Sequence, residues 1–185
     1  MNTYIALLRG INVGGHNKIK MAELKSALLS VGFESVTTYI QSGNIIFKDI
    51  SEDIDMLEEK MHKTIQDTFG LDVPVLVIRD SLLQEILNNN PFAERLKNNE
   101  IEDKKMYFML LCNAPDEAAT LELHNLSFDP EEFKITPYVI YLFAANGYGK
   151  TKLHNNFFER KLKCQATTRN LKTLNKLLEL SLLMD

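Results

Sequence analysis

Runs of hydrophobic residues and helix-spaced apolar positions divide the first half of the chain into six elements. The runs predict strands over 3–9, 36–41, 44–48 and 73–79, with a tight two-residue turn at Ser42-Gly43 between the second and the third. Apolar positions at helical spacing predict helices over 21–31 and 52–69. Ser51 is expected to start the second helix and Gly70 to end it. This order, βαββαβ, is that of the ferredoxin-like unit.

The second half of the chain repeats the pattern after a short connecting helix over 81–87. The expected strands are 105–112, 128–136, 138–143 and 165–168, and the expected helices are 116–124, 152–163 and 170–183. The sequence therefore predicts an α+β protein with two tandem ferredoxin-like βαββαβ subdomains and an extra C-terminal helix. A polar stretch with Pro91 and Asn98-Asn99 marks the boundary, which gives subdomains 1–88 and 105–185 joined by segment 89–104.

Two of the predicted strands are apolar on both faces. Ile5 to Leu8 and Val75 to Ile78 show no alternation between polar and apolar residues. A ferredoxin-like sheet on its own has one uncovered face, so that face must be covered here by the other subdomain or by a second subunit. A homodimer is therefore one of the two expectations.

Composition places the chain among ordinary globular proteins. Of its 185 residues, 45% are hydrophobic and 25% are charged. The longest apolar run, Tyr138 to Ala145, is far shorter than the ~20 residues that span a bilayer, so no membrane partner is expected. Cys112 and Cys164 are far apart in sequence and suggest no disulfide framework. We expect a cytoplasmic protein.

The net charge of the chain is −4, but the charged residues are unevenly distributed along it. Residues 51–145 hold 8 Lys and Arg against 19 Asp and Glu, whereas residues 146–185 hold 8 against 3. A basic segment can attract phosphate or nucleic acid, although such clusters are often merely solvated helix faces.

The predicted topology brings two polar loops of the first half to one end of the sheet. The loop after the first strand runs from Arg9 to Gly15, and the hairpin between the second and third strands contains Ser42-Gly43-Asn44. Gly14 and Gly15 allow backbone amides to form a concave anion site, with Arg9 as a fork for phosphate or carboxylate. Asn12, Ser42 and Asn44 would add neutral hydrogen bonds. The alternative is that both segments are tight turns whose Asn side chains bond to the backbone.

A second pair of loops is expected to meet at one end of the second sheet. Residues 146–152 (NGYGKTK) should lie close to residues 167–170 (TTRN), which nominates Lys150, Lys152, Thr168, Arg169 and Asn170 as ligand-binding residues. Residues 144–151 also read A-x-x-x-x-G-K-T, close to a nucleotide phosphate loop. A nucleotide hydrolase of that type needs a parallel sheet and a later acidic magnesium ligand, which the sequence does not offer. A plain anion-binding loop remains, or a cap of the last helix by Thr168 or Asn170.

Catalytic and metal-binding patterns are otherwise poor. The four histidines are scattered without metal spacing, so no metal site is predicted, and no cofactor or catalytic residue is identified. His16 borders the glycine loop as either an acid-base group or a solvated side chain. Cys112 ends a hydrophobic strand and is expected to be a small buried residue rather than a nucleophile.

Several of these segments together resemble the uncharacterised bacterial family called domain of unknown function 1697. The resemblance rests on residues 9–15 (RGINVGG) with Met21 and Leu24, on Tyr39 and Ser42-Gly43-Asn44 before Phe47, and on Lys152-Leu153 and residues 166–170 (ATTRN). It implies a cytoplasmic protein with two ferredoxin-like subdomains and no established activity. The sequence departs from the family pattern at Lys150-Thr151, where Arg-Ser is usual, and at Leu171, where an aromatic is usual. The first change keeps a cation and a hydroxyl, whereas the second weakens any stacking role.

Three function classes follow from the sequence. The first is a protein that binds or acts on a small anionic ligand, phosphorylated or nucleotide-like, and whether it is an enzyme stays open. The second is an RNA-binding module, which the acidic net charge and the lack of an aromatic-rich sheet signature disfavour. The third is a structural or regulatory homodimer without a ligand.

Overall fold

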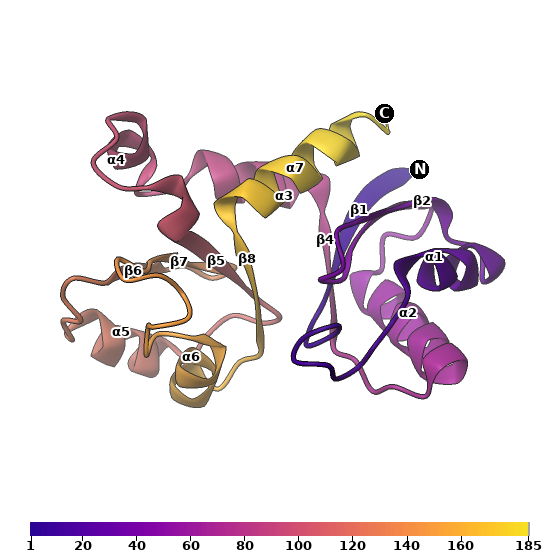
Figure 1. Ribbon diagram of the computed structural model, residues 1–185, viewed down its shortest axis with the longest axis horizontal. Coiled ribbons are helices and arrows are strands. Elements are labelled where there is room, and N and C mark those ends of the chain that lie inside the picture. Colours follow the sequence, from indigo (N-terminus) through magenta and orange to yellow (C-terminus); the bar gives the residue numbers. More distant parts are fainter. Residues whose placement is uncertain (185) are drawn as a thin grey trace. The chain divides into compact units, whose positions relative to one another are not determined.

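The computed structural model describes residues 1–184, and Asp185, the last residue of the predicted second subdomain, lies outside the described residues. Figure 1 shows the course of the chain. The residues group into two compact units. One contains residues Met1–Gln84 and the chain from Lys176 onward, and the other contains Glu85–Asn175. Each unit is built around one four-stranded antiparallel sheet, so the α+β class and the two βαββαβ repeats are confirmed.

The first sheet has the strand order β2-β3-β1-β4. Its strands are β1 (Asn2–Leu8), β2 (Glu34–Tyr39), β3 (Asn44–Asp49) and β4 (Val75–Arg79), and helices α1 (Met21–Ser30) and α2 (Ile54–Phe69) cover one face (Figure 1). Leu7 of β1 is opposite Asn44 of β3, so the end of β1 and the β2–β3 hairpin lie at the same end of the sheet. This is the juxtaposition on which the first predicted site depends.

Helix α2 begins two residues later than the sequence suggested. Its N-cap is Asp53, whose side chain accepts a hydrogen bond from the Met56 amide at 3.0 Å, and the expected cap Ser51 lies before it. Two carboxylates near the helix start favour this position because they oppose the positive end of the helix dipole. The helix ends at Gly70 with φ +66°, as predicted.

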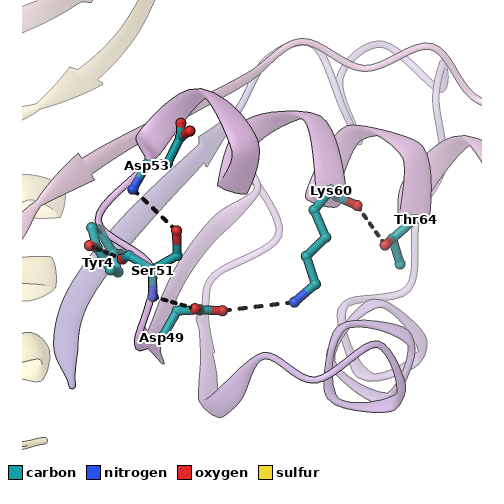
Figure 2. A network of polar contacts seen from close by, with 6 residues as sticks. All are labelled: Tyr4, Asp49, Ser51, Asp53, Lys60 and Thr64. Atoms are coloured by element: carbon teal, nitrogen blue, oxygen red, sulfur yellow. Dashed lines mark hydrogen bonds and ion pairs between the residues drawn. The ribbon is translucent and has the colours of Figure 1, made fainter.

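Ser51 instead anchors the β3–α2 connection in a polar network that Figure 2 shows. Its carbonyl accepts a hydrogen bond from the buried Tyr4 hydroxyl at 2.6 Å, and its amide donates to Asp49 at 2.9 Å. Lys60 of α2 approaches the same Asp49 carboxylate at 3.8 Å and covers the Phe33 ring at 4.3 Å from its centre. The network ties α2 to the sheet that it covers.

The core of the first unit lies between its sheet and the helices α1 and α2. It contains Leu24 and Leu28 of α1, Leu57 and Met61 of α2, and alternate residues of the central strands. In β1, none of Thr3 to Leu8 is more than 5% exposed, so both faces of this strand are buried in a single chain. Burial on both faces agrees with the lack of alternation in its sequence.

The second sheet has the equivalent order β6-β7-β5-β8. Its strands are β5 (Met106–Leu111), β6 (Glu132–Ile135), β7 (Val139–Phe143) and β8 (Ala166–Asn170), and helices α5 (Glu117–His124) and α6 (Asn155–Leu162) lie on one face (Figure 1). Phe143 is opposite Met106, and Asn170 is opposite Tyr107. The loop after β7 and the end of β8 therefore share one sheet end, as the sequence predicted.

The segment before β5 is more ordered than a linker. It contains helix α3 (Asp80–Asn88), the short helix α4 (Ala93–Lys97) and the 3-10 turn η1 (Asp103–Lys105). Tyr141 of β7 donates its hydroxyl to the Ile86 carbonyl at 2.9 Å, and burial raises the pKa of this tyrosine to about 12. The Nη1 of Arg95 in α4 donates to both carboxylate oxygens of Glu132, each at 2.8 Å. These contacts join the segment to the second sheet.

Two elements of the second unit are shorter than predicted. The strand expected over 128–136 is only β6, because Pro130 has no amide hydrogen to donate to a sheet and residues 128–131 close a turn through Glu131 N–H and Phe128 O at 2.9 Å. Helix α6 begins at Asn155 rather than at residue 152. Helix α7 (Leu171–Leu182) follows β8, which confirms the extra C-terminal helix.

No helix within residues 1–184 has the length and apolar character needed to cross a bilayer.

Candidate functional site

The side chain of Asn12 holds the first predicted loop closed through hydrogen bonds to the backbone. Its amide nitrogen donates to the carbonyls of Ile19 at 2.9 Å and Gln41 at 2.8 Å, and its amide oxygen accepts from the Ile19 N–H at 2.9 Å. Asn12 adopts a φ of +54°, which Asn tolerates better than most residues. The side chain therefore holds both the loop and the neighbouring hairpin. This agrees with the alternative in which both segments are turns whose Asn side chains bond to the backbone.

Gly14 and Gly15 form the tip of the same loop. Their φ values are +59° and +82°, and the His16 N–H donates to the Val13 carbonyl at 3.0 Å. Positive φ at both central residues is the requirement of a type I′ hairpin turn. An anion nest needs neighbouring residues of opposite backbone hand, which two positive φ values do not provide. The turn accounts for both glycines, and their predicted role in binding stays a prediction.

Gly43 is where the hairpin packs against β1. A Cβ atom added there would lie 2.6 Å from Leu8 Cβ and 2.9 Å from Ile11 Cδ1, so only glycine fits. The connection between β2 and β3 spans residues 40–43, which corrects the predicted two-residue turn. Ile40 and Gly43 both have positive φ in this longer loop.

The hairpin is further held by Asn44, which is fully buried. Its amide donates to the Tyr39 carbonyl at 3.1 Å and to the Ser42 hydroxyl at 2.9 Å. The two loops of the first site do meet, but on the side of the first loop the contact is made by Ile11 and Asn12 rather than by Gly14 and Gly15. A Cβ atom on Gly14 would meet only the His16 ring within 4 Å, and one on Gly15 would meet nothing.

Arg9 leaves the end of β1 half-buried. Its backbone N–H donates to the Pro74 carbonyl at 3.0 Å, which fixes the start of the loop beside β4. The ligand-binding role of its guanidinium stays a prediction.

In the second unit, the loop over 146–152 is folded around the buried Thr151. The Thr151 hydroxyl donates to the Glu131 carboxylate at 2.5 Å and accepts from the Leu153 N–H at 2.8 Å. Two backbone turns precede it, from Gly147 N–H to Ala144 O at 2.8 Å and from Lys150 N–H to Gly147 O at 3.0 Å. The loop is therefore shaped by its own turns and by Glu131.

A pocket of about 510 Å³ lies between this loop and the turn over 127–131. We call it the Lys150 pocket, and it is lined by Ser127, Phe128, Asp129, Pro130, Glu131, Asn146, Lys150 and Lys152. Its volume falls in the range of small-molecule sites. Within residues 1–184, neither lysine forms an ion pair with a carboxylate, and Asp129 has no cationic partner.

Thr168 lies beside the 146–152 loop, as the topology predicted. The Tyr148 hydroxyl is 3.3 Å from the Thr168 hydroxyl, which in turn donates to the Asn155 side-chain oxygen. Asn155 donates to the Ala166 carbonyl at 2.9 Å, and the Tyr148 ring packs on Tyr107 with 4.7 Å between centres. These bonds give Thr168 a structural role that links β8, α6 and the loop.

Asn170 and Arg169 complete the predicted set. The Asn170 side chain accepts from the Thr173 N–H at 2.8 Å, which is the geometry of a helix cap and confirms that alternative for Asn170. Burial lowers the pKa of the Arg169 guanidinium to about 10, and the group donates to the Thr168 carbonyl at 2.8 Å. Of the five residues predicted in this half, only Lys150 and Lys152 line the Lys150 pocket.

The sequence pattern predicts a strand over 128–136 and therefore misses the turn over 127–131. The signal was present, since Asp129-Pro130 is a typical turn pair next to Glu131 and Glu132. Within residues 1–184, no group of three or more His, Cys, Asp or Glu side chains is arranged to hold a metal ion. Cys112 is exposed, which corrects the expectation of a buried residue, because it follows the last residue of β5.

Comparison with solved structures finds a similar fold in a bacterial protein. The structure of the conserved bacterial protein SP0830 from Streptococcus pneumoniae is similar, with a TM-score of 0.75 and 26% sequence identity over 97% of this chain and 98% of that one. No curated protein matches the chain. The family described as protein of unknown function DUF1697 matches residues 1–141, which include the glycine loop, the first sheet and most of the second. The chain therefore belongs to the DUF1697 family.

Proposed function

We propose that the protein binds a small molecule through an anionic group, phosphate or carboxylate, in the Lys150 pocket. The observation that carries the proposal is the pairing of a pocket of ligand size with two ammonium groups that have no carboxylate partner among residues 1–184. Asn146 adds a neutral amide at the same rim.

The position of the two lysines supports this role. Lys150 and Lys152 flank Thr151 in sequence, and Thr151 is buried and bonded on both sides to Glu131 and Leu153. Because the middle residue is fixed, the backbone that carries both lysines is fixed as well. A pre-formed loop reduces the ordering cost of binding.

The first predicted site is a weaker candidate because its polar groups already have structural tasks. Asn12 uses its amide donors and its oxygen within the protein, and Asn44 is fully buried. A ligand there would have to displace hydrogen bonds that hold the loop. In the Lys150 pocket, a ligand would not have to break an ion pair of Lys150, Lys152 or Asp129 with another residue of 1–184.

Binding can be tested by an NMR titration of isotope-labelled protein with inorganic phosphate, pyrophosphate, AMP and glucose 6-phosphate. We expect saturable shifts confined to 127–131 and 146–152 for at least one of these probes. Lys150→Ala and Lys152→Ala should each weaken binding about tenfold, since a hydrogen bond to a charged group contributes ~1.5–3 kcal/mol.

Lys161→Ala is the matched control, because Lys161 is an exposed lysine of the neighbouring helix α6 outside the pocket. It should bind the probe like the wild type. An equal loss in all three variants would indicate a general charge effect and contradict the proposal. Salt-sensitive binding of RNA oligonucleotides, without binding of any small anion, would favour the RNA-binding alternative instead.

A further inference from the structure

The Lys150 pocket carries both signs of charge on facing segments. Lys150 and Lys152 come from the loop after β7, whereas Asp129 and Glu131 come from the turn before β6. A ligand with only negative charge would be attracted by the first pair and repelled by the second. Inorganic phosphate or a simple phosphate ester is therefore a poor electrostatic match for the pocket as a whole.

Both carboxylates retain acceptor capacity. One oxygen of Glu131 accepts from Thr151, and its other oxygen has no hydrogen-bond partner within residues 1–184. Asp129 is exposed and forms no side-chain hydrogen bond or ion pair in the same part of the chain. Ionised carboxylates only accept hydrogen bonds, so the group that they recognise must be a donor, and a cation is the best one.

Resting on the proposed function, we infer that the ligand of the Lys150 pocket is bipolar, with an anionic group held by Lys150 and Lys152 and a cationic amine held by Asp129 and Glu131. The pocket volume of about 510 Å³ accommodates a compact molecule in which the two charges are a few bonds apart. Amino acids, amino sugar phosphates and phosphorylated amines share this chemistry.

The side walls of the pocket fit a small linking group between the two charges. Phe128 packs edge-on against Phe157 at 5.6 Å between ring centres and also contacts Phe133, so its ring is held in place. Pro130 is the other apolar wall residue. Together they offer apolar surface to a short carbon chain between the ends of the ligand.

The test compares two probes that differ by one charged group: phosphoethanolamine and ethyl phosphate. In an NMR titration of the full chain, we expect phosphoethanolamine to bind about three- to tenfold more tightly than ethyl phosphate, as two partly exposed ion pairs would provide. Asp129→Asn should remove most of this preference while leaving ethyl phosphate binding equal or slightly stronger. Glu122→Gln, a charge-matched change on α5 outside the pocket, should leave the preference intact.

The outcomes separate this inference from the proposal on which it rests. If the two probes bind equally and Lys150→Ala weakens both, the bipolar inference is wrong and the anion-binding proposal stands. If neither of these two probes nor any of the four anions tested above produces a saturable shift at the pocket, both are wrong. A preference that survives in both Asp129→Asn and Glu131→Gln would overturn the assignment of the amine to these carboxylates.

Discussion

The carboxylate of Glu58 accepts a hydrogen bond from the backbone N–H of Val77 at 2.7 Å. Val77 lies in β4, at the edge of the first sheet, where this amide has no neighbouring strand to bond to. In the second unit, Glu159 accepts from the Ala166 N–H of the edge strand β8 at 2.8 Å. Both glutamates are the fifth residue of their helix, α2 or α6. In both repeats, therefore, a glutamate of the second helix accepts a hydrogen bond from a backbone amide of the edge strand.

Removing the Glu58 acceptor should destabilise the protein. Glu58→Ala leaves the amide of the buried Val77 without a partner, which costs about 1–3 kcal/mol of unfolding free energy. Glu58→Gln keeps an oxygen acceptor and should lose much less. Urea unfolding of the three proteins at pH 7 measures the difference, and equal stability of Glu58→Ala and wild type would contradict the role of the bond.

The same residue should contribute a pH dependence of opposite sign to that of most carboxylates. Burial raises the pKa of Glu58, with the hydrogen bond from Val77 opposing the shift and Asp55 adding to it. Because the folded state then holds the proton more tightly than the unfolded state, this group makes the protein more stable as pH falls from its raised folded pKa towards 4.5.

Glu58→Gln has no such titration, so its stability relative to wild type should decrease as pH falls through that window. Unfolding both proteins at several values between pH 7 and pH 4 cancels the contribution of all other groups. A stability difference that is constant with pH, or a Glu58→Gln variant that gains stability relative to wild type on acidification, would show that the pKa of Glu58 is not raised.

The sequence predicts the order of elements well because that order depends on local patterns. Uninterrupted apolar runs identify β1 and β7, Gly70 ends α2, and the repetition of βαββαβ implies both sheet orders. The boundaries depend on competing local groups. Asp53 replaces Ser51 as the cap of α2, and Pro130 shortens the strand expected over 128–136.

The candidate site was predicted less well because one residue type serves several purposes. Asn12 and Gly15 fit an anion loop as well as they fit a closed turn, and only the hydrogen-bond partners distinguish the two. Asp129 and Glu131 belong to the Lys150 pocket through a turn that folds back on the loop after β7. Such long-range proximity leaves no trace in local periodicity.

Gly43 should be far less tolerant of substitution than Gly15, although both have positive φ. In Gly43→Ala the new methyl group would collide with Leu8 and Ile11, at the point where the hairpin packs on β1. We expect the free energy of unfolding to fall by about 2–4 kcal/mol, because overpacking adds to the cost of placing alanine at a positive φ. In Gly15→Ala the new methyl group would lie in open space. This variant should therefore lose only the cost of alanine at a positive φ, about 1–2 kcal/mol of unfolding free energy. Denaturant midpoints of the two variants decide this, and equal losses would mean that the hairpin moves away freely.

Asn12 should matter for loop closure and not for ligand binding. Asn12→Gly removes three hydrogen bonds while keeping the backbone free to adopt φ +54°, and it should cost about 1–3 kcal/mol. Asn12→Ala should lose about 1 kcal/mol more, because alanine is strained at that φ. Amide hydrogen exchange should show faster opening of the loop around Ile19 in both variants. If either variant also abolished the phosphate shifts at Lys150 and Lys152, the separation of the two loops in function would be wrong.

The two cysteines should differ sharply in reactivity. Cys112 is exposed just after β5, whereas Cys164 is buried between α6 and β8, where burial and then the nearby Glu159 raise the pKa of its thiol. Because the thiolate is the reactive form, burial slows the reaction of Cys164 both by excluding the reagent and by disfavouring ionisation.

Titration of the native protein with a chromogenic disulfide should therefore label one thiol quickly and the second only at the rate of unfolding. Cys112→Ser should remove the fast phase and leave the slow one, and addition of urea should bring both thiols to the same rate. Two fast thiols in the native wild type would contradict the burial of Cys164. A fast phase that persists in Cys112→Ser would show that Cys164, and not Cys112, is the reactive thiol.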